Sequence, residues 1–261
     1  MPKFAANLSM MFTEFPFLDR FRAAADCGFT AVEFLFPYEH AAELIADKLS
    51  EAGLVQALFN MSPGNWDGGE RGLAALPGRE SEFAQSVETA ISYARVIGTP
   101  RLHMMAGIVS ARNPVATDAY RKNLKRAAEL TGEAGIGLVI EPINSRDMPG
   151  YFLDNFDRAV SFIAEINLPH VQLQFDIYHR QILHGDVIMA LRRFAPLIGH
   201  IQVASVPDRH EPLTGELDDL RIFTEIDAIG YQGYVGCEYR PRRGTKDGLG
   251  WIGKVSDPPD G

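Results

Sequence analysis

The sequence predicts a single α/β domain folded as a closed (β/α)8 TIM barrel, on three observations. Eight short β-type runs recur along the 261 residues, amphipathic segments of helical length separate them, and glycine or proline punctuates nearly every run. Such alternation is typical of parallel strands joined by right-handed crossovers. A barrel of this kind usually takes about 250 residues. We therefore expect one domain over residues 1–261.

The expected strands are short runs dominated by apolar residues. They are 4–10, 31–36, 54–60, 101–107, 137–144, 171–179, 198–206 and 234–240. An open, doubly wound sheet would show the same alternation of strand and helix. The number of runs and the length of the chain favour the closed barrel over that alternative.

The segments between the runs carry apolar residues three and four positions apart, as in 17–24 and 124–130. This spacing predicts helices with one buried face. Thr117 and Asp118 are expected to start one helix and Asp154 another. The tail 250–261 is rich in proline and glycine, so we expect it to be irregular and the eighth helix to be short or irregular.

Composition restricts the partners. With 46% hydrophobic and 23% charged residues the chain can enclose a large core, and its formal net charge of −9 without a basic run argues against nucleic acid. No stretch has the length or apolarity of a signal peptide or a membrane span. Cys27 and Cys237 lie far apart, which fits a reducing compartment. We expect a cytoplasmic enzyme that does not bind membranes; a homo-oligomer stays open.

Polar side chains stand near the ends of four consecutive expected strands. They are Glu141 in the fifth, Asp176 in the sixth, Gln202 in the seventh and Glu238 in the eighth. Barrel enzymes build their chemistry at the carboxyl ends of the strands, and the alternation of side chains directs these four inward. We therefore expect them to converge.

Three converging carboxylates repel one another unless a cation lies among them. Two glutamates, an aspartate and an amide oxygen form an all-oxygen set, which favours Mg²⁺ or Mn²⁺ and also allows Co²⁺. The alternative is that these carboxylates pair with arginines or cap helices. No dinucleotide fingerprint or P-loop is present, so no organic cofactor is expected.

Histidine and arginine residues are candidates for the substrate. His179 follows Asp176 by three residues and can bind a substrate oxygen or orient a metal ligand. His103 and His200 lie deeper along their strands, where a core or supporting role is favoured.

The long glycine-rich connection after the third strand can form a lid over the site. It contains Trp66, Arg71 and Arg79, and a guanidinium there suits an anionic substrate. The alternative is a solvated loop whose arginines pair with Glu70 and Glu80.

Seven motifs, in order along the whole chain, resemble the hydroxypyruvate isomerase and 2-oxo-tetronate isomerase family within the xylose-isomerase-like barrel superfamily. They are "FAANLSMMFTEFPFLDRF", "VEFLFPY", "GERGLAALPGRE", "IEPIN", "FDIYH", "GHIQVA" and "GCEYRP". The resemblance implies that Glu141, Asp176, Gln202 and Glu238 hold the metal and that the two glutamates form the catalytic acid/base pair. Related ketose epimerases usually have histidine at the third metal position, so Gln202 favours the isomerase branch.

The implied reaction converts hydroxypyruvate to tartronate semialdehyde through a metal-stabilised enediolate. Arg209 and Arg240 join Arg71 as candidates for the substrate carboxylate, and Glu33 and Asn60 for its hydroxyl groups, with purely structural hydrogen bonding as the alternative for the last two. Other substrates on the same scaffold are a four-carbon 2-oxo-tetronate or a ketose undergoing 3-epimerisation. A zinc nuclease of the endonuclease IV type and a non-catalytic sugar-binding barrel are further alternatives.

Overall fold

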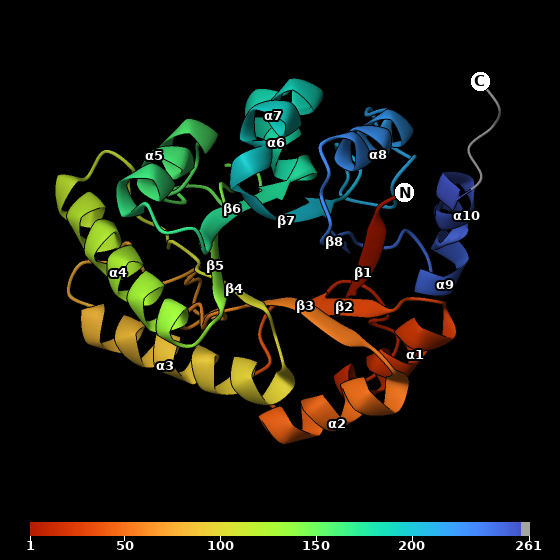
Figure 1. The fold of residues 1–261 in the computed structure, drawn as a ribbon, viewed down its shortest axis with the longest axis horizontal. Helices are drawn as coiled ribbons and strands as arrows, with labels where there is room; N and C mark the ends of the chain where they lie inside the picture. The colour runs from red at the N-terminus through yellow and green to blue at the C-terminus, as the bar shows by residue number, and fades with distance from the viewer. Residues whose placement is uncertain (257–261) are drawn as a thin grey trace.

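The computed structural model describes residues 1–256, and its strands form a closed parallel barrel in the order β1 to β8 (Figure 1). The strands are β1 (Lys3–Asn7), β2 (Ala31–Phe34), β3 (Val55–Asn60), β4 (Arg101–His103), β5 (Gly137–Ile140), β6 (Val171–Asp176), β7 (Ile198–Val203) and β8 (Tyr234–Cys237). β1 pairs with both β2 and β8, so the sheet has no free edge. The predicted closed barrel is confirmed, and the open sheet is excluded.

Helices surround the ring of strands (Figure 1). They are α1 (Arg20–Asp26), α2 (Ala42–Ala52), α3 (Glu80–Ile97), α4 (Pro114–Glu133), α5 (Phe156–Ile166), α6 (Ile177–His184), α7 (Val187–Phe194), α8 (Asp219–Ala228), α9 (Thr245–Gly248) and α10 (Gly250–Ser256), with 3₁₀ turns η1 (Phe17–Asp19) and η2 (Ala195–Leu197). None of the helices within residues 1–256 combines the length and apolarity that crossing a membrane requires.

Two helices start at other residues than the sequence suggested. α4 begins at Pro114, before Thr117, because proline suits the first helical position and the Asn113 side chain accepts a hydrogen bond from Val115 N at 3.0 Å. α5 is capped by Asn155, which accepts from Arg158 N at 3.0 Å, instead of by Asp154. Asparagine is therefore the capping residue in both helices.

The expected irregular tail is wrong for residues 250–256, which form α10. Trp251 and Val255 lie one helical turn apart and are both buried. The Trp251 ring packs edge-on against Phe4, with ring centroids 4.8 Å apart, and its Nε1 donates to Tyr239 Oη at 3.2 Å. This apolar anchoring outweighs the low helical propensity of the glycines, and the remainder of the predicted tail, 257–261, lies outside the described residues.

The interior of the barrel changes from apolar to polar toward the carboxyl ends of the strands. Small side chains (Ala5, Ala31 and Ala57) form one buried cluster within the sheet, whereas the large apolar core includes residues of the strands and the surrounding helices. Buried polar residues are also present in the strands, among them Asn7, Glu33, Gln174, His200 and Gln202. These buried polar side chains form the support on which the site is built.

Candidate active site

A cavity of about 800 Å³ opens at the carboxyl ends of the strands. It is lined by Glu141 and Glu238, which directly follow β5 and β8, by His179 at the start of α6, and by residues of the loops after β1, β3, β4, β5 and β7. This is the face on which barrel enzymes carry their active sites. The cavity therefore lies where the strand-end residues are expected to converge.

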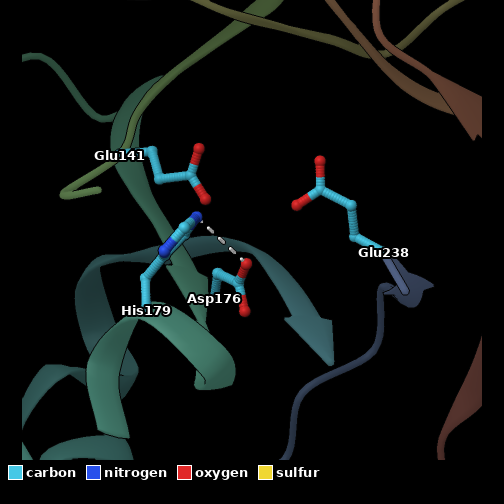
Figure 2. Close-up of side chains that lie close together, drawn as sticks. All are labelled: Glu141, Asp176, His179 and Glu238. Carbon is cyan, nitrogen blue, oxygen red and sulfur yellow. Dashed lines mark ion pairs between the residues drawn. The ribbon is translucent and has the colours of Figure 1, made fainter. Parts of the chain in front are cut away.

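Four side chains form a compact cluster at the base of this cavity, and one ligand atom of each lies within 4.8 Å of those of the other three. They are Glu141, Asp176, His179 and Glu238. Figure 2 shows Glu141 and Glu238 reaching toward each other from opposite sides, with Asp176 and His179 below them in this view. The structure thus brings together all three predicted carboxylates.

The two carboxylate oxygens of Asp176 have different surroundings. As the N-cap of α6 it accepts a hydrogen bond from Tyr178 N at 2.8 Å through Oδ1, which fixes the carboxylate at the strand end. Its Oδ2 is buried without a hydrogen-bond partner. His179 Nε2 and a terminal nitrogen of Arg209 each lie 3.6 Å from it. The alternative that such carboxylates merely cap helices therefore accounts for only one of the two oxygens.

Burial raises the pKa values of all three carboxyl groups. The pKa of Glu141 lies well above its usual value because of burial and of the neighbouring charges of Glu238 and Asp176. Burial likewise raises the pKa of Asp176 to about 6 and that of Glu238 to about 8, although Arg209 acts in the opposite direction on both. Such shifts are typical of functional sites, because a purely structural carboxylate is usually fully paired.

The cluster fits a divalent cation. Glu141 Oε1 and Asp176 Oδ2 are buried acceptors without hydrogen-bond partners, and an unsatisfied buried carboxylate oxygen is costly unless a cation or a ligand meets it. With three carboxylates at one point, the donors are mainly oxygen, as hard cations prefer. These residues could therefore hold a metal ion.

Gln202, the expected fourth ligand, is hydrogen bonded at both ends of its amide. Its Nε2 donates to Glu33 Oε1 at 2.8 Å, and its Oε1 accepts from Gln174 Nε2 at 2.6 Å. An amide oxygen has two lone pairs, and Gln174 uses one of them. The contacts orient the side chain, and its role as a ligand stays a prediction.

Glu33 does not line the cavity, contrary to its expected role with a substrate hydroxyl. It is fully buried and accepts hydrogen bonds from Asn7 Nδ2 at 2.9 Å and Gln202 Nε2 at 2.8 Å, while His200 Nε2 lies 2.6 Å from its Oε2. Gly236 on β8 makes room for it, because a Cβ there would collide with the Glu33 carboxylate. Glu33 therefore supports the site from below, and His200 has the supporting role expected of it.

Asn60 and His103 lie at the cavity wall. His103 Nδ1 is 3.2 Å from Asn60 Oδ1, and its Nε2 is 3.7 Å from Glu141 Oε2. Burial lowers the pKa of His103 to about 3, so the ring is neutral at pH 7. His103, expected to be a core or supporting residue, contacts one of the two glutamates directly.

Arg71 lines the cavity from the connection between β3 and α3. Its guanidinium carbon lies 3.8 Å from the centre of the Trp66 ring, and its Nη1 donates to the backbone oxygens of Trp66 and Glu70 at 2.9 and 2.7 Å. Arg79 instead pairs with Glu70 and Glu82 and does not line the cavity. Of the two loop arginines, only Arg71 faces the site, whereas the solvated-loop alternative describes Arg79, with Glu82 in place of Glu80.

Arg209 is largely buried, whereas an arginine that binds substrate at the rim of the cavity would be exposed. It has 13% side-chain exposure, and one of its terminal nitrogens is 2.6 Å from Glu238 Oε2 while the other is 3.2 Å from Asp147 Oδ2. Burial lowers the pKa of Arg209, but the surrounding carboxylates raise it above the usual value. Arg240, by contrast, is exposed at the edge of the same cavity.

Three residues that connect parts of the site were not among the sequence-based predictions. Asn144, Asp147 and Tyr178 connect the loop after β5 to His179 and Arg209: Tyr178 Oη donates to Asp147 Oδ1 at 3.2 Å, and Asn144 Nδ2 lies 2.6 Å from His179 Nδ1. Asn144 and Tyr178 stand within the motifs "IEPIN" and "FDIYH", and this was the available signal. No periodicity or motif marks Asp147, because its contacts are made across a loop.

Comparison with known proteins identifies the family. Residues 21–255 match the family model described as xylose isomerase-like TIM barrel. The chain is 54% identical over 254 residues to the 2-oxo-tetronate isomerase of Cupriavidus necator, covering 97% of this chain and 98% of that protein. It is 40% identical to the hydroxypyruvate isomerase of Escherichia coli, with 97% and 98% coverage.

Among solved structures, one from Brucella melitensis, described as an AP endonuclease of family 2, superposes with a TM-score of 0.95 at 46% identity and covers 97% of this chain and 98% of its own. An L-ribulose 3-epimerase superposes with a TM-score of 0.75 at 20% identity, covering 98% and 86%, which shows the shared fold alone. The fold, the converging carboxylates and these relatives agree. The chain is an isomerase of the xylose isomerase-like TIM barrel family and belongs with the hydroxypyruvate and 2-oxo-tetronate isomerases.

Proposed function

We propose that the protein is a metal-dependent isomerase that moves the carbonyl group of a small hydroxy-oxo acid by one carbon. The observation that carries the proposal is the placement of two glutamates, Glu141 and Glu238, on opposite sides of one buried cluster (Figure 2). A proton must leave the carbon that bears the hydroxyl group, and a proton must reach the neighbouring carbonyl carbon. Two facing carboxyl groups can serve as the base and the acid for these steps.

Glu141, Asp176 and Glu238 would hold the metal, with Gln202 as the proposed fourth ligand. Mg²⁺ or Mn²⁺ is favoured by the oxygen-rich set, and Co²⁺ is also compatible. When bound, a divalent cation supplies Lewis-acid stabilisation of the negative charge that develops on the substrate oxygens, a contribution of several kcal/mol. Burial raises the pKa of both glutamates, that of Glu238 to about 8, which favours proton uptake by these carboxyl groups.

The substrate proposed is an acid. Among the side chains that line the cavity, Arg71, Arg146, Arg209 and Arg240 are cationic. Arg209 is already paired with Glu238 and Asp147, and Arg146 and Arg240 are exposed. Arg71, held on Trp66, is therefore the best placed to receive the substrate carboxylate. Asn60 and His179 line the same cavity and can bind substrate oxygens.

The sequence motifs favoured the three-carbon acid, hydroxypyruvate. The comparisons shift our preference to a four-carbon 2-oxo-tetronate, because relatives of 54% and 46% identity bear that name, against 40% for the E. coli hydroxypyruvate isomerase. Hydroxypyruvate is the second candidate. We further propose that the enzyme works in the cytoplasm, which fits its two unpaired cysteines.

The decisive experiment is an isomerisation assay with Mg²⁺ or Mn²⁺ on 2-oxo-tetronates, hydroxypyruvate and a neutral ketose in parallel. We expect the 2-oxo-tetronates to react fastest and the ketose to react poorly. Glu141→Gln and Glu238→Gln should each lower kcat by about 10²- to 10⁴-fold, and Glu225→Gln, which alters a carboxylate paired with Arg192 on the outer helices, is the control.

Full turnover in both glutamine variants, measured with metal saturation verified by calorimetry, would refute the acid/base roles. A further arm offers DNA with abasic sites, because one solved relative is described as an endonuclease. We expect no cleavage, since the net charge of −9 opposes a DNA backbone and the metal cluster contains a single histidine.

A further inference from the structure

The two ring nitrogens of His179 face different surroundings. Nδ1 faces Asn144, whereas Nε2 faces the carboxylate cluster, 3.6 Å from Asp176 Oδ2. A neutral imidazole has one N–H group and one lone pair, and only the lone pair can bind a metal ion. The position of a single proton therefore decides whether His179 serves as a ligand or as a hydrogen-bond donor.

The side-chain amide of Asn144 is held in one orientation by Asp147. Its Oδ1 accepts from the backbone N–H of Asp147 at 2.9 Å, and its Nδ2 donates to Asp147 Oδ2 at 3.5 Å. A flipped amide would set its NH₂ group against that backbone N–H and lose both bonds. The NH₂ group of Asn144 must therefore face His179.

His179 Nδ1 consequently accepts two hydrogen bonds. One comes from Asn144 Nδ2 at 2.6 Å and the other from the backbone N–H of Asn144 at 3.4 Å. A nitrogen that accepts has no proton of its own. A backbone N–H can only donate, so Nδ1 is the unprotonated nitrogen, and the single proton of the neutral ring lies on Nε2.

We propose that Asn144, oriented by Asp147, is a positioning residue that locks His179 in the Nε2–H tautomer and makes it a hydrogen-bond donor to the cluster, not a metal ligand. The four side chains of the cluster would then divide into three carboxyl groups, which could hold a metal through oxygen, and one neutral donor. That this donor meets a substrate oxygen rests on the proposed function. The tautomer itself depends only on the contacts described.

The test is nitrogen-15 NMR of the histidine rings, using long-range correlations that distinguish a protonated from an unprotonated ring nitrogen. Two other histidines serve as internal references, because a carbonyl oxygen can only accept. His170 Nε2 lies 2.8 Å from Ala128 O, which sets the Nε2–H form, and His210 Nδ1 lies 2.7 Å from Arg240 O, which sets the Nδ1–H form. The His179 signals are assigned by their loss in His179→Gln.

In the wild-type protein we expect His179 to show the His170 pattern, both without metal and with saturating Mg²⁺. A His210-type pattern, a doubly protonated ring at pH 7, or loss of the Nε2 proton on adding Mg²⁺ would each overturn the proposal. This readout is independent of turnover. If the tautomer is as expected but no isomerase activity is found, the positioning role stands and the proposed function fails.

Variants then test the role of Asn144. In Asn144→Asp the carboxylate can only accept, so a proton must appear on His179 Nδ1; if Nδ1 stays unprotonated in the folded variant, Asn144 does not control the tautomer. Asn155→Asp is the matched control, because it makes the same substitution at the cap of α5, where the side-chain oxygen accepts from Arg158 N and does not contact His179. It should retain the wild-type His179 pattern, and the same change of pattern in both variants would contradict the proposal.

Discussion

One terminal nitrogen of Arg209 lies 2.6 Å from Glu238 Oε2 and 3.6 Å from Asp176 Oδ2, so a buried guanidinium contacts two of the three carboxylates of the cluster. Asp176 Oδ2 is also a buried oxygen without a hydrogen-bond partner. Arg209 also contacts Asp147 and lies over the ring of Tyr178, 4.9 Å from its centre. Its charge therefore offsets part of the repulsion among the acids.

Replacing Arg209 with methionine should destabilise the protein. Removing one partner of a buried ion pair leaves the other charge uncompensated, which typically costs about 3–5 kcal/mol, and protonation of Glu238 sets the expected loss at the lower end, about 3 kcal/mol. The free energy of unfolding in urea measures it. Arg240→Met, at the exposed edge, is the control and should change stability by less than about 0.5 kcal/mol; equal losses in both variants would contradict the buried role of Arg209.

Metal binding should stabilise the fold and support turnover. At a concentration of 100 times Kd, Mg²⁺ or Mn²⁺ should raise the free energy of unfolding by about 2.7 kcal/mol, because the ligand binds only the folded state. Chelation should remove both the stabilisation and the activity. Glu225→Gln should retain the effect and Asp176→Asn should lose it, as measured by thermal unfolding; an Asp176→Asn protein stabilised as fully as the wild type would exclude the cluster as the binding site.

Arg71 should determine the preference for acids. Arg71→Lys keeps the charge but loses the planar stacking on Trp66 and the fork that matches a carboxylate. We expect KM for the acid substrate to rise by roughly 10-fold with little change in kcat, equivalent to about 1.4 kcal/mol. Arg79→Lys, in the same loop but outside the cavity, is the matched control, and a similar rise in KM there would indicate a general effect on the loop.

Gly236 should tolerate no side chain. A Cβ at this position would collide with the Glu33 carboxylate and displace it from His200 and Gln202, so Gly236→Ala should cost about 3 kcal/mol or more of stability. Gly250→Ala is the comparison, because nothing lies within 4 Å of a Cβ at that site. Denaturant unfolding measures both, and equal stability of the two variants would show that Glu33 moves freely.

Asp219 gives the stability a defined pH dependence. Burial raises its pKa from 3.8 to about 6, so the carboxyl group stays neutral to a higher pH in the folded chain than in the unfolded chain. The contribution of this carboxyl group to the free energy of unfolding is complete below about pH 4 and is lost as the pH rises through about 6. Asp219→Asn should therefore be roughly 1–3 kcal/mol more stable than the wild type at pH 7.5, with no advantage at pH 4.

The matched variant for this experiment is Asp219→Ala. The aspartate Oδ2 accepts a hydrogen bond from Leu213 N at 2.6 Å, which asparagine can replace and alanine cannot. The alanine variant should be less stable than the asparagine variant at every pH. A stability difference between Asp219→Asn and the wild type that is the same at pH 4 and pH 7.5 would show that the effect is not electrostatic.

The sequence could predict the barrel and the three carboxylates because both depend on local order. Strand runs and the polar residues that end them can be recognised within a few positions, and the closed sheet then sends Glu141, Asp176 and Glu238 to one place. The depth of Glu33 was not predictable in the same way. It depends on a register irregularity between Val32 and Phe34 and on the space beside Gly236, more than two hundred residues away.

Contacts between loops could not be predicted from the sequence either. Arg209 and Asp147 are 62 residues apart, and no pattern in either segment indicates that they meet. The capping asparagines and the helix at Trp251 show a related limit, because neighbouring residue types offered several plausible helix boundaries and tertiary packing selected one. The converging carboxylates could therefore be predicted from the sequence, whereas the residues that hold them in place could not.

The hydrogen-bonded pairing of β1 with β8 joins the two ends of the sheet. Glu238 follows β8 directly, whereas Glu141 follows β5, three strands away around the barrel. A ligand that contacts both glutamates therefore bridges the opening of the barrel. Separation of β1 from β8 would move Glu238 away from such a ligand. A ligand bound in the cavity should therefore slow hydrogen exchange of the backbone amides that pair β1 with β8. It would stabilise this strand pairing without contacting it.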